Sequence, residues 1–133
     1  MNDQLISQAK KVSQLAIARY SNFKVGAALE TSSGEIFTGC NIEVSSYGLT
    51  ICAERVALFK ALSEGAKGFK TLAIYTETED FCPPCGACRQ VIWDFAPDIS
   101  IILVNKKNQE KVVSISEFYP HAFGDHFFGN RDK

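Results

Sequence analysis

Apolar side chains recur at helical spacing in two stretches of the chain, and a proline pair marks the start of a third predicted helix. In residues 3–20, apolar side chains at helical spacing would lie on one face of a helix and polar side chains on the other, which predicts an amphipathic helix. Residues 52–64 repeat the pattern after Thr50, a residue type that caps helices, and stop at Gly65. Residues 85–95 follow a proline pair, and proline suits a first helical turn because an N–H there would lack a partner. We therefore expect three main helices.

Shorter apolar runs between these helices predict strands. Residues 25–31 and 35–40 flank a Ser-Ser-Gly turn and form a predicted hairpin, whose small residues leave room for a closely packed neighbour. Further strands are expected at residues 72–76, 101–104 and 111–114. This alternation predicts an α/β fold, a three-layer α/β/α sandwich with a central mixed five-stranded sheet. We expect a single domain over residues 1–133.

The charge, apolar runs and cysteines of the chain restrict the classes of partner that we expect for this domain. The 133 residues carry 14 basic and 15 acidic side chains, mixed along the chain, for a formal charge of −1. A nucleic-acid surface normally shows a basic excess, so we expect no nucleic-acid partner. We also expect no membrane partner, because the sequence shows no signal peptide and no apolar run of spanning length. Five cysteines without an export signal favour a reducing compartment, and we expect a cytoplasmic protein.

Three cysteines and one glutamate stand at the predicted starts of two helices. Cys52 and Glu54 are two residues apart, while Cys85 and Cys88 follow Pro84 at Cys-x-x-Cys spacing. Three thiolates fill three corners of a zinc tetrahedron and leave the fourth to water, as in a catalytic site. The partial positive charge of helix N-termini favours thiolates. Glu54 is then the carboxylate that moves protons for this water.

A closed structural zinc site is the alternative interpretation, and it would make the chain a zinc-stabilised interaction module. Such a site needs a fourth protein ligand. Cys82 is the main candidate because it lies three residues before Cys85, although it belongs to the loop ahead of the predicted helix. The other candidates are Cys40, His121 and His126.

Two arginines adjoin the cysteines. A zinc ion with three thiolates carries a formal charge of −1, which weakens its pull on a bound water. Arg55, next to Glu54, and Arg89, next to Cys88, are candidates to donate hydrogen bonds to the sulfurs and offset that charge. We predict that Arg55 has this role.

The pattern Cys-x-Glu followed by Pro-Cys-x-x-Cys, in residues 52–54 and 84–88, resembles the zinc-dependent cytidine deaminases. Residues 23–29, Phe-Lys-Val-Gly-Ala-Ala-Leu, are similar to a Phe-Pro-Val-Gly-Ala-Ala-Leu segment of the small tetrameric members of that family. Residues 40–43 are similar to their Cys-Asn-Ile-Glu segment. The resemblance covers nearly the whole chain.

This resemblance implies a fold and a reaction. The fold is cytidine deaminase-like, with one Zn²⁺ per chain held by Cys52, Cys85 and Cys88. The reaction is the hydrolytic deamination of cytidine and 2′-deoxycytidine to uridine and 2′-deoxyuridine, with release of ammonia, for pyrimidine salvage. Glu54 would be the proton shuttle for a zinc-activated water that attacks C4 of the base.

The resemblance also implies which side chains bind the nucleoside. Phe23 would stack on the pyrimidine, while Asn41 and Glu43 would hydrogen-bond the ribose hydroxyl. Ser45 stands next to the loop expected to hold the 5′-hydroxyl.

Two further residues imply an assembly. Tyr47 is similar to a loop residue that reaches the site of a neighbouring subunit, and Phe123 is similar to a phenylalanine that caps the pocket from another subunit. We therefore expect a homotetramer whose pockets are shared across subunits.

Some positions depart from the family pattern. Lys24 replaces the usual proline beside Phe23, and Val44-Ser45 replace the usual Asn-Ala. These changes lie near the expected sugar contacts, so a deaminase of a modified cytosine nucleoside is the second enzyme hypothesis. A polynucleotide-editing deaminase is disfavoured by the missing basic surplus and by a cysteine, rather than a histidine, at Cys52.

Overall fold

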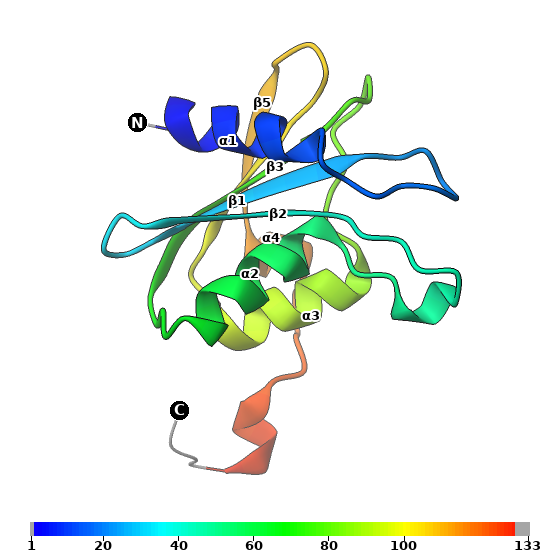
Figure 1. Ribbon diagram of the computed structural model, residues 1–133. Coiled ribbons are helices and arrows are strands. Elements are labelled where there is room, and N and C mark those ends of the chain that lie inside the picture. The colour runs from blue at the N-terminus through cyan, green and yellow to red at the C-terminus, as the bar shows by residue number, and fades with distance from the viewer. Residues whose placement is uncertain (1, 130–133) are drawn as a thin grey trace.

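The computed structural model of the protein describes residues 2–129, in which one five-stranded sheet lies between two layers of helices (Figure 1). The strands are β1 Val25–Thr31, β2 Ile36–Cys40, β3 Phe69–Thr76, β4 Ser100–Val104 and β5 Glu110–Ser114. The α-helices are α1 Asp3–Ser13, α2 Ala53–Ser63, α3 Gly86–Phe95 and α4 Ile115–Phe118. Two short 3₁₀ helices span Tyr47–Leu49 and Asp125–Phe128.

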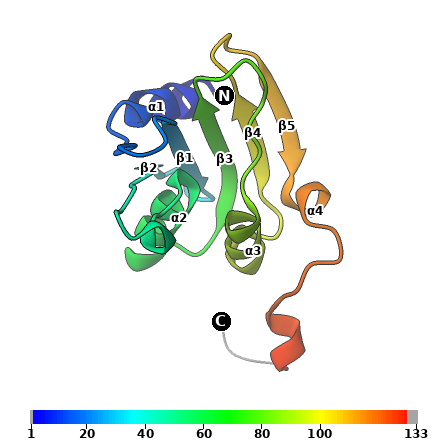
Figure 2. The same cartoon turned by 90° about the vertical axis from the view of Figure 1, so that its right-hand side faces the viewer.

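The strands lie in the order β2-β1-β3-β4-β5 (Figure 2). Among the five strands of residues 2–129, only β3 and β4 pair in parallel, and the connection between these two strands contains α3. The pairs β1–β2, β1–β3 and β4–β5 are antiparallel, so the sheet is mixed as predicted. Helix α1 covers one face of this sheet, and α2 and α3 cover the other (Figure 1). The predicted three-layer α/β/α sandwich is confirmed.

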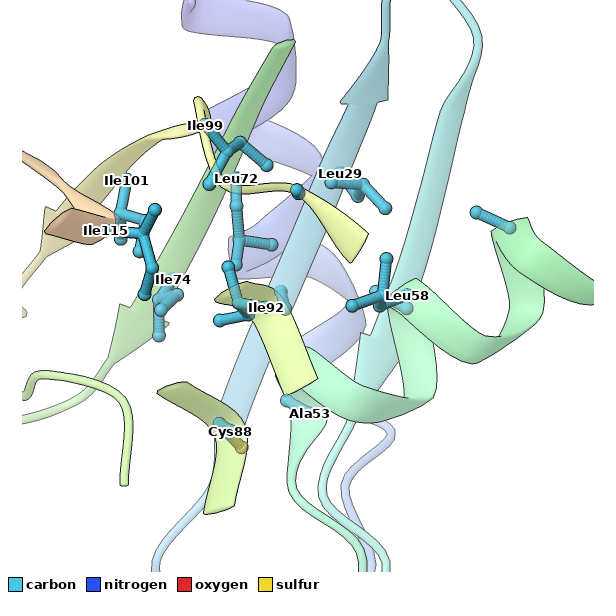
Figure 3. Packing of buried hydrophobic residues seen from close by; sticks show 14 of the residues in the cluster. Leu29, Ala53, Leu58, Leu72, Ile74, Cys88, Ile92, Ile99, Ile101 and Ile115 are labelled. Carbon is cyan, nitrogen blue, oxygen red and sulfur yellow. The ribbon is translucent and has the colours of Figure 1, made fainter. Parts of the chain in front are cut away.

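Alternating side chains of the central strands supply two separate cores. Leu72 and Ile74 of β3 pack with α2 and α3, whereas Ala73 between them packs with α1. Strand β4 divides in the same way, because Ile101 joins the first core and Ile102 the second. Figure 3 shows the larger core, in which Cys88 of α3 lies with the apolar side chains. Burial on both faces explains the continuous apolar runs of these strands.

Gly26 and Gly39 allow the helices to approach the sheet closely. A Cβ atom at Gly26 would lie 1.9 Å from the backbone oxygen of Ala9 in α1. A Cβ atom at Gly39 would lie 2.5 Å from the backbone nitrogen of Ala57 in α2. The small residues of the hairpin therefore serve helix packing on both faces, as the sequence indicated.

The predicted helix over residues 3–20 is too long, because α1 ends at Ser13. The following segment pairs with a distant part of the chain: Ile17 N donates to Asn41 O at 3.0 Å, and Glu43 N donates to Ile17 O at 2.8 Å. Leu15, which continues the apolar periodicity, is 72% exposed. Apolar spacing alone could not reveal a long-range backbone pairing that ends the helix.

Other predicted boundaries need smaller corrections. Cys52, rather than Thr50, is the N-cap residue of α2, and the Thr50 hydroxyl instead accepts a hydrogen bond from Val44 N at 3.1 Å. Strand β3 begins at Phe69 and so is longer than predicted. The ends of the predicted 1–133 domain, residue 1 and residues 130–133, lie outside the described residues. Within residues 2–129, none of the helices has the length and apolar character to cross a membrane.

Candidate active site

The N-termini of α2 and α3 bring three thiols together. Cys52 is the N-cap of α2, Cys85 is the N-cap of α3, and Cys88 lies in the first turn of α3. All three Sγ atoms lie within 4.8 Å of one another, and those of Cys52 and Cys85 are 3.7 Å apart. Their exposure increases from the buried Cys88 through Cys52 to the exposed Cys85. The predicted thiol cluster is therefore formed by the fold.

The geometry of this cluster fits a zinc ion. Tetrahedral Zn–S bonds of about 2.3 Å place neighbouring sulfurs about 3.8 Å apart, close to the Cys52–Cys85 separation. Within residues 2–129, no fourth cysteine, histidine or carboxylate ligand joins the group. Cys82, the rival ligand, is not a member. Three soft thiolates with a fourth position left open match catalytic zinc.

Arg55 supplies positive charge to the cluster. Its Nη2 donates a hydrogen bond to Cys52 Sγ at 3.4 Å. The pKa of the Cys52 thiol is lowered to about 5, chiefly by a hydrogen bond from Cys88 and also by the Arg55 guanidinium. Arg89 takes a different role, because it donates to Pro84 O at 2.7 Å and Phe118 O at 2.9 Å. Arg89 thus ties the loop before α3 to α4.

Glu54 lies in the first turn of α2 with only 5% of its surface exposed. Burial raises the pKa of its carboxyl group to about 7, since the charged form loses its hydration, and the nearby Cys52 thiolate adds to this effect. A carboxyl group with a pKa near neutrality can take up and release a proton at the pH of a cell. Glu54 therefore has the property that a proton shuttle requires.

A cavity of about 230 Å³ opens above these groups. Cys52, Cys85, Glu54 and Phe23 all line it. The remaining lining residues are Ser21, Val25, Asn41, Glu43, Thr50, Ile51, Ala53, Ile74, Cys82 and Pro83. The lining is mostly apolar with a few convergent polar groups, which is typical of a small-molecule site.

Asn41 holds the segment that carries Phe23. Its Nδ2 donates to Phe23 O at 2.7 Å, and its Oδ1 accepts from Val25 N at 2.9 Å. Asn41 is buried, whereas the Phe23 ring is 39% exposed at the cavity. An amide uses one donor and one acceptor in these bonds, so one of each remains for a ligand.

Glu43 is held by the segment before Phe23. Its Oε1 accepts hydrogen bonds from Tyr20 N at 2.8 Å and Ser21 N at 3.1 Å, and its Oε2 accepts one from Ser21 Oγ. The hydrogen bond from the Ser21 hydroxyl, followed by those from the backbone, holds the pKa of Glu43 below its usual value. Glu43 is therefore an ionised acceptor at the mouth of the cavity at neutral pH.

Tyr47 lies in an adjoining cavity of about 340 Å³, lined by Tyr20, Ser21, Glu43, Tyr47 and Thr50. The rings of Tyr20 and Tyr47 are 5.3 Å apart, and Tyr47 is 70% exposed. Ser45 is exposed on the same loop and lines neither cavity among the residues described. The structure of one chain thus places Tyr47 and Ser45 beside, not within, the cavity of the thiol cluster.

Phe123 lies far along the C-terminal segment, which extends away from the body of the domain after α4 (Figure 2). Its backbone oxygen accepts a hydrogen bond from Gln90 Nε2 at 2.8 Å, and its ring stacks on Phe127 at 5.4 Å. The Phe123 side chain is 52% exposed and does not line the cavity of its own chain among the described residues. In a single chain, Phe123, the residue predicted to cap the pocket, therefore lies outside that pocket.

Ser21, Thr50 and Cys82 are cavity residues that sequence reasoning did not assign to the substrate site. Ser21 and Thr50 are polar loop residues of a common type, and their sequence gives no signal of a site. Cys82 gave a signal through its spacing from Cys85, but that signal suggested a metal ligand. Its place on the cavity wall depends on the path of the loop before α3.

Comparisons with known proteins agree with this site. Residues 1–104 match the family model described as the cytidine and deoxycytidylate deaminase zinc-binding region. The chain is 45% identical over 122 residues to a cytidine deaminase from Sporosarcina psychrophila, which covers 91% of this chain and 90% of that protein. The crystal structure of cytidine deaminase from Burkholderia pseudomallei superposes with a TM-score of 0.90 at 45% identity, covering 92% of this chain and 99% of that one. The chain is also 36% identical over 104 residues to a blasticidin-S deaminase from Bacillus cereus, with 72% and 74% coverage.

Proposed function

The chain belongs to the zinc-dependent cytidine deaminase family, and from this premise we propose that it hydrolyses cytidine and 2′-deoxycytidine to uridine and 2′-deoxyuridine for pyrimidine salvage. One observation carries the proposal. Two thiols of a three-thiol cluster with an open fourth position line a cavity, and the buried Glu54 with its raised pKa lines the same cavity. These are the groups that a hydrolytic deamination of a small ring requires.

The proposed reaction adds water to C4 of the base and breaks the C4–N bond. Cys52, Cys85 and Cys88 would hold a zinc ion, which would supply a Lewis acid that lowers the pKa of a water molecule. The Glu54 carboxylate takes a proton from the attacking water and delivers it to ring N3. Glu54 then carries the next proton to the exocyclic nitrogen, which leaves as ammonia. The apolar cavity wall keeps other water from competing for that carboxylate.

We propose that the segment around Phe23 binds the nucleoside. The Phe23 ring on the cavity wall offers a face to the pyrimidine. The remaining donor and acceptor of Asn41 and the ionised Glu43 carboxylate suit a sugar hydroxyl. We also propose that Ser45 lies at the rim of the cavity on the sugar side, because it belongs to the loop that follows Glu43.

We propose a homotetramer in which neighbouring chains complete each pocket. Three observations support this assembly: Tyr47 in the adjoining cavity is exposed, the Phe123 segment extends from the domain (Figure 2), and the aromatic side chains of that segment are exposed. Exposed aromatic clusters of this kind mark contact surfaces. In this arrangement Tyr47 and Phe123 of one chain reach the sites of others.

We also propose a single catalytic domain over residues 1–133 that works in the cytoplasm. The shared cores on both faces of one sheet support a single domain. The zinc ligands must remain reduced thiols, and the cytosol maintains that state. All five cysteines are free in the structure, which agrees with a reducing compartment.

A deaminase of a modified cytosine nucleoside is the second candidate. The similarity to a blasticidin-S deaminase favours it, as do Lys24 and Ser45, which depart from the usual residues near the sugar side. The match to that enzyme covers 72% of the chain, against 91% for the cytidine deaminase from Sporosarcina psychrophila. The plain nucleosides therefore remain the first choice.

The test follows the ultraviolet absorbance of cytidine with metal-quantified protein, comparing wild type with Glu54→Gln. We expect one zinc per chain in both proteins, because the thiols are unchanged. We expect turnover in the wild type and a loss of at least about a hundredfold in the variant, since proton transfer by a positioned group contributes that much.

Each alternative has its own outcome. A zinc-loaded wild type that leaves cytidine and 2′-deoxycytidine intact, but converts a modified cytosine nucleoside, would replace the first candidate by the second. A zinc-loaded protein inactive on all of them would support a structural module. Full activity of Glu54→Gln would remove Glu54 from the mechanism.

A further inference from the structure

The Ser21 hydroxyl connects the two groups that face the nucleoside. It donates a hydrogen bond to Glu43 Oε2, and it accepts one from Phe23 N at 3.0 Å. Ser21 also lies on the walls of both cavities. A single side chain thus touches the carboxylate proposed for the sugar and the backbone that carries the ring proposed for the base.

These two bonds require a hydroxyl group. A hydroxyl donates one hydrogen bond and accepts others, whereas an alanine in its place can do neither. The chain turns sharply here, because Asn22 has a left-handed backbone with φ of 57°. The bond from Phe23 N to Ser21 Oγ spans this turn and so fixes the direction in which the Phe23 ring leaves it.

The bonds to Glu43 hold both of its oxygens. Backbone N–H groups of Tyr20 and Ser21 bind Oε1, while only the Ser21 hydroxyl binds Oε2 among the described residues. Without that hydroxyl, the Glu43 carboxylate could rotate about its hydrogen bonds from Tyr20 N and Ser21 N to Oε1. A ligand would then have to order the carboxylate as it binds, which weakens its binding.

We propose that Ser21 is a positioning residue, which fixes the Glu43 carboxylate for a sugar hydroxyl and joins it to the turn that presents Phe23. This inference rests on the proposed function, because it concerns the same nucleoside site. It assigns to Ser21 a role in affinity and not in the chemical step, since Ser21 contacts neither the thiol cluster nor Glu54 in the hydrogen bonds of the structure.

The test is a double-mutant cycle of Ser21→Ala and Glu43→Ala, with cytidine binding measured by calorimetry in zinc-loaded Glu54→Gln protein, which binds without turnover. We expect Ser21→Ala to weaken binding about three- to tenfold when Glu43 is present, which is the cost of ordering one side chain. We expect a smaller effect, of about twofold, in the Glu43→Ala background, because only the bond from Phe23 N then depends on the Ser21 hydroxyl.

Two control variants test whether the hydroxyl of Ser21 is the group that matters. Ser21→Thr keeps the hydroxyl and should restore binding, whereas the surface substitution Ser7→Ala on α1 should leave it unchanged. With an intact Glu54, Ser21→Ala should raise KM for cytidine while kcat stays within about twofold, as expected for loss of ground-state binding.

Equal losses of affinity in the Glu43 and Glu43→Ala backgrounds, or a fall in kcat alone, would overturn the role of Ser21. Ser21→Ala protein that binds cytidine as tightly as its parent would overturn it too, while leaving the proposed reaction intact. A parent protein that neither binds nor deaminates cytidine would overturn the proposed function together with this inference.

Discussion

Arg55 shows how one side chain can set the properties of a metal cluster. It donates to Cys52 Sγ, and its Nε is buried without a hydrogen-bond partner among the described residues. Its guanidinium is one of the causes of the lowered pKa of Cys52, after the hydrogen bond from Cys88. Removal of this charge should raise the pKa of the Cys52 thiol.

We therefore predict that Arg55→Gln lowers zinc affinity about tenfold, the size of effect found for groups that support metal ligands. The loss should be larger at pH 6 than at pH 8, because a thiol with a higher pKa holds its proton more strongly against the metal at low pH. Competition with a chelator at both pH values measures it. Unchanged affinity at both would remove Arg55 from this role, and Arg55→Lys tests whether charge alone suffices.

Glu43 gives a second prediction at the residue scale. Its pKa is held below the usual value, first by the Ser21 hydroxyl and next by Tyr20 N. A carboxyl group with a depressed native pKa stabilises the fold above its unfolded pKa, and that contribution is lost as the pH falls through the native pKa. Because the Ser21 hydroxyl is the largest cause of the depression, Ser21→Ala should raise the pKa of Glu43 towards its ordinary value. An NMR titration of the side-chain carboxyl carbon measures this shift, and an unchanged midpoint would contradict it.

Among the elements, the contact between α1 and β1 depends on a missing side chain. A Cβ at Gly26 would meet the backbone oxygen of Ala9 at 1.9 Å and the backbone nitrogen of Ser13 at 2.8 Å. These are backbone atoms, so the helix itself would have to move. The same helix buries Leu5, Ile6 and Ala9 against the sheet.

We predict that Gly26→Ala destabilises the protein by at least about 2 kcal/mol, a usual cost of overpacking. Gly48→Ala is the matched control, because a Cβ there meets nothing within 4 Å, and its effect should stay within about 0.5 kcal/mol. Urea denaturation of both variants gives the free energy of unfolding. A Gly26→Ala protein as stable as the wild type would show that α1 can shift without cost.

At the scale of the whole molecule, the aromatic C-terminal segment bears on the proposed tetramer. Phe123, Phe127 and Phe128 are 52%, 66% and 57% exposed, on a segment that extends from the domain (Figure 1). In the proposed tetramer, Phe123 of one chain serves the pocket that contains Glu54 of another. Each site then draws its groups from different chains.

This arrangement predicts complementation between two defective proteins. Co-expressed Glu54→Gln and Phe123→Ala chains should show more cytidine turnover than the two proteins give separately, because mixed assemblies contain sites with both intact groups. Glu54→Gln with Cys85→Ser should give no recovery, since both residues belong to the same chain's site. Failure of the first pair to recover, with a native mass equal to one chain, would contradict shared pockets.

The framework of this protein could be predicted from the order and spacing of its residues. Helix periodicity and short apolar runs predicted the sandwich, since a continuous run such as Leu72, Ala73 and Ile74 indicates a strand buried on both faces. The spacing of Cys52, Cys85 and Cys88 predicted the metal cluster, because their distance in space follows from two helix starts at one edge of the sheet. The Cys-x-Glu and Cys-x-x-Cys patterns and the strand and helix patterns are each local, because each concerns neighbours along the chain.

Only the tertiary structure decided the features that join distant segments. The end of α1 depends on the pairing of Ile17 with the backbone of Asn41 and Glu43. The link from Ser21 to Glu43 and the raised pKa of Glu54 likewise depend on which groups lie close in space and which are shut away from water. Hydrogen bonds and burial across such long separations leave no periodic trace in the sequence, so the fold had to reveal them.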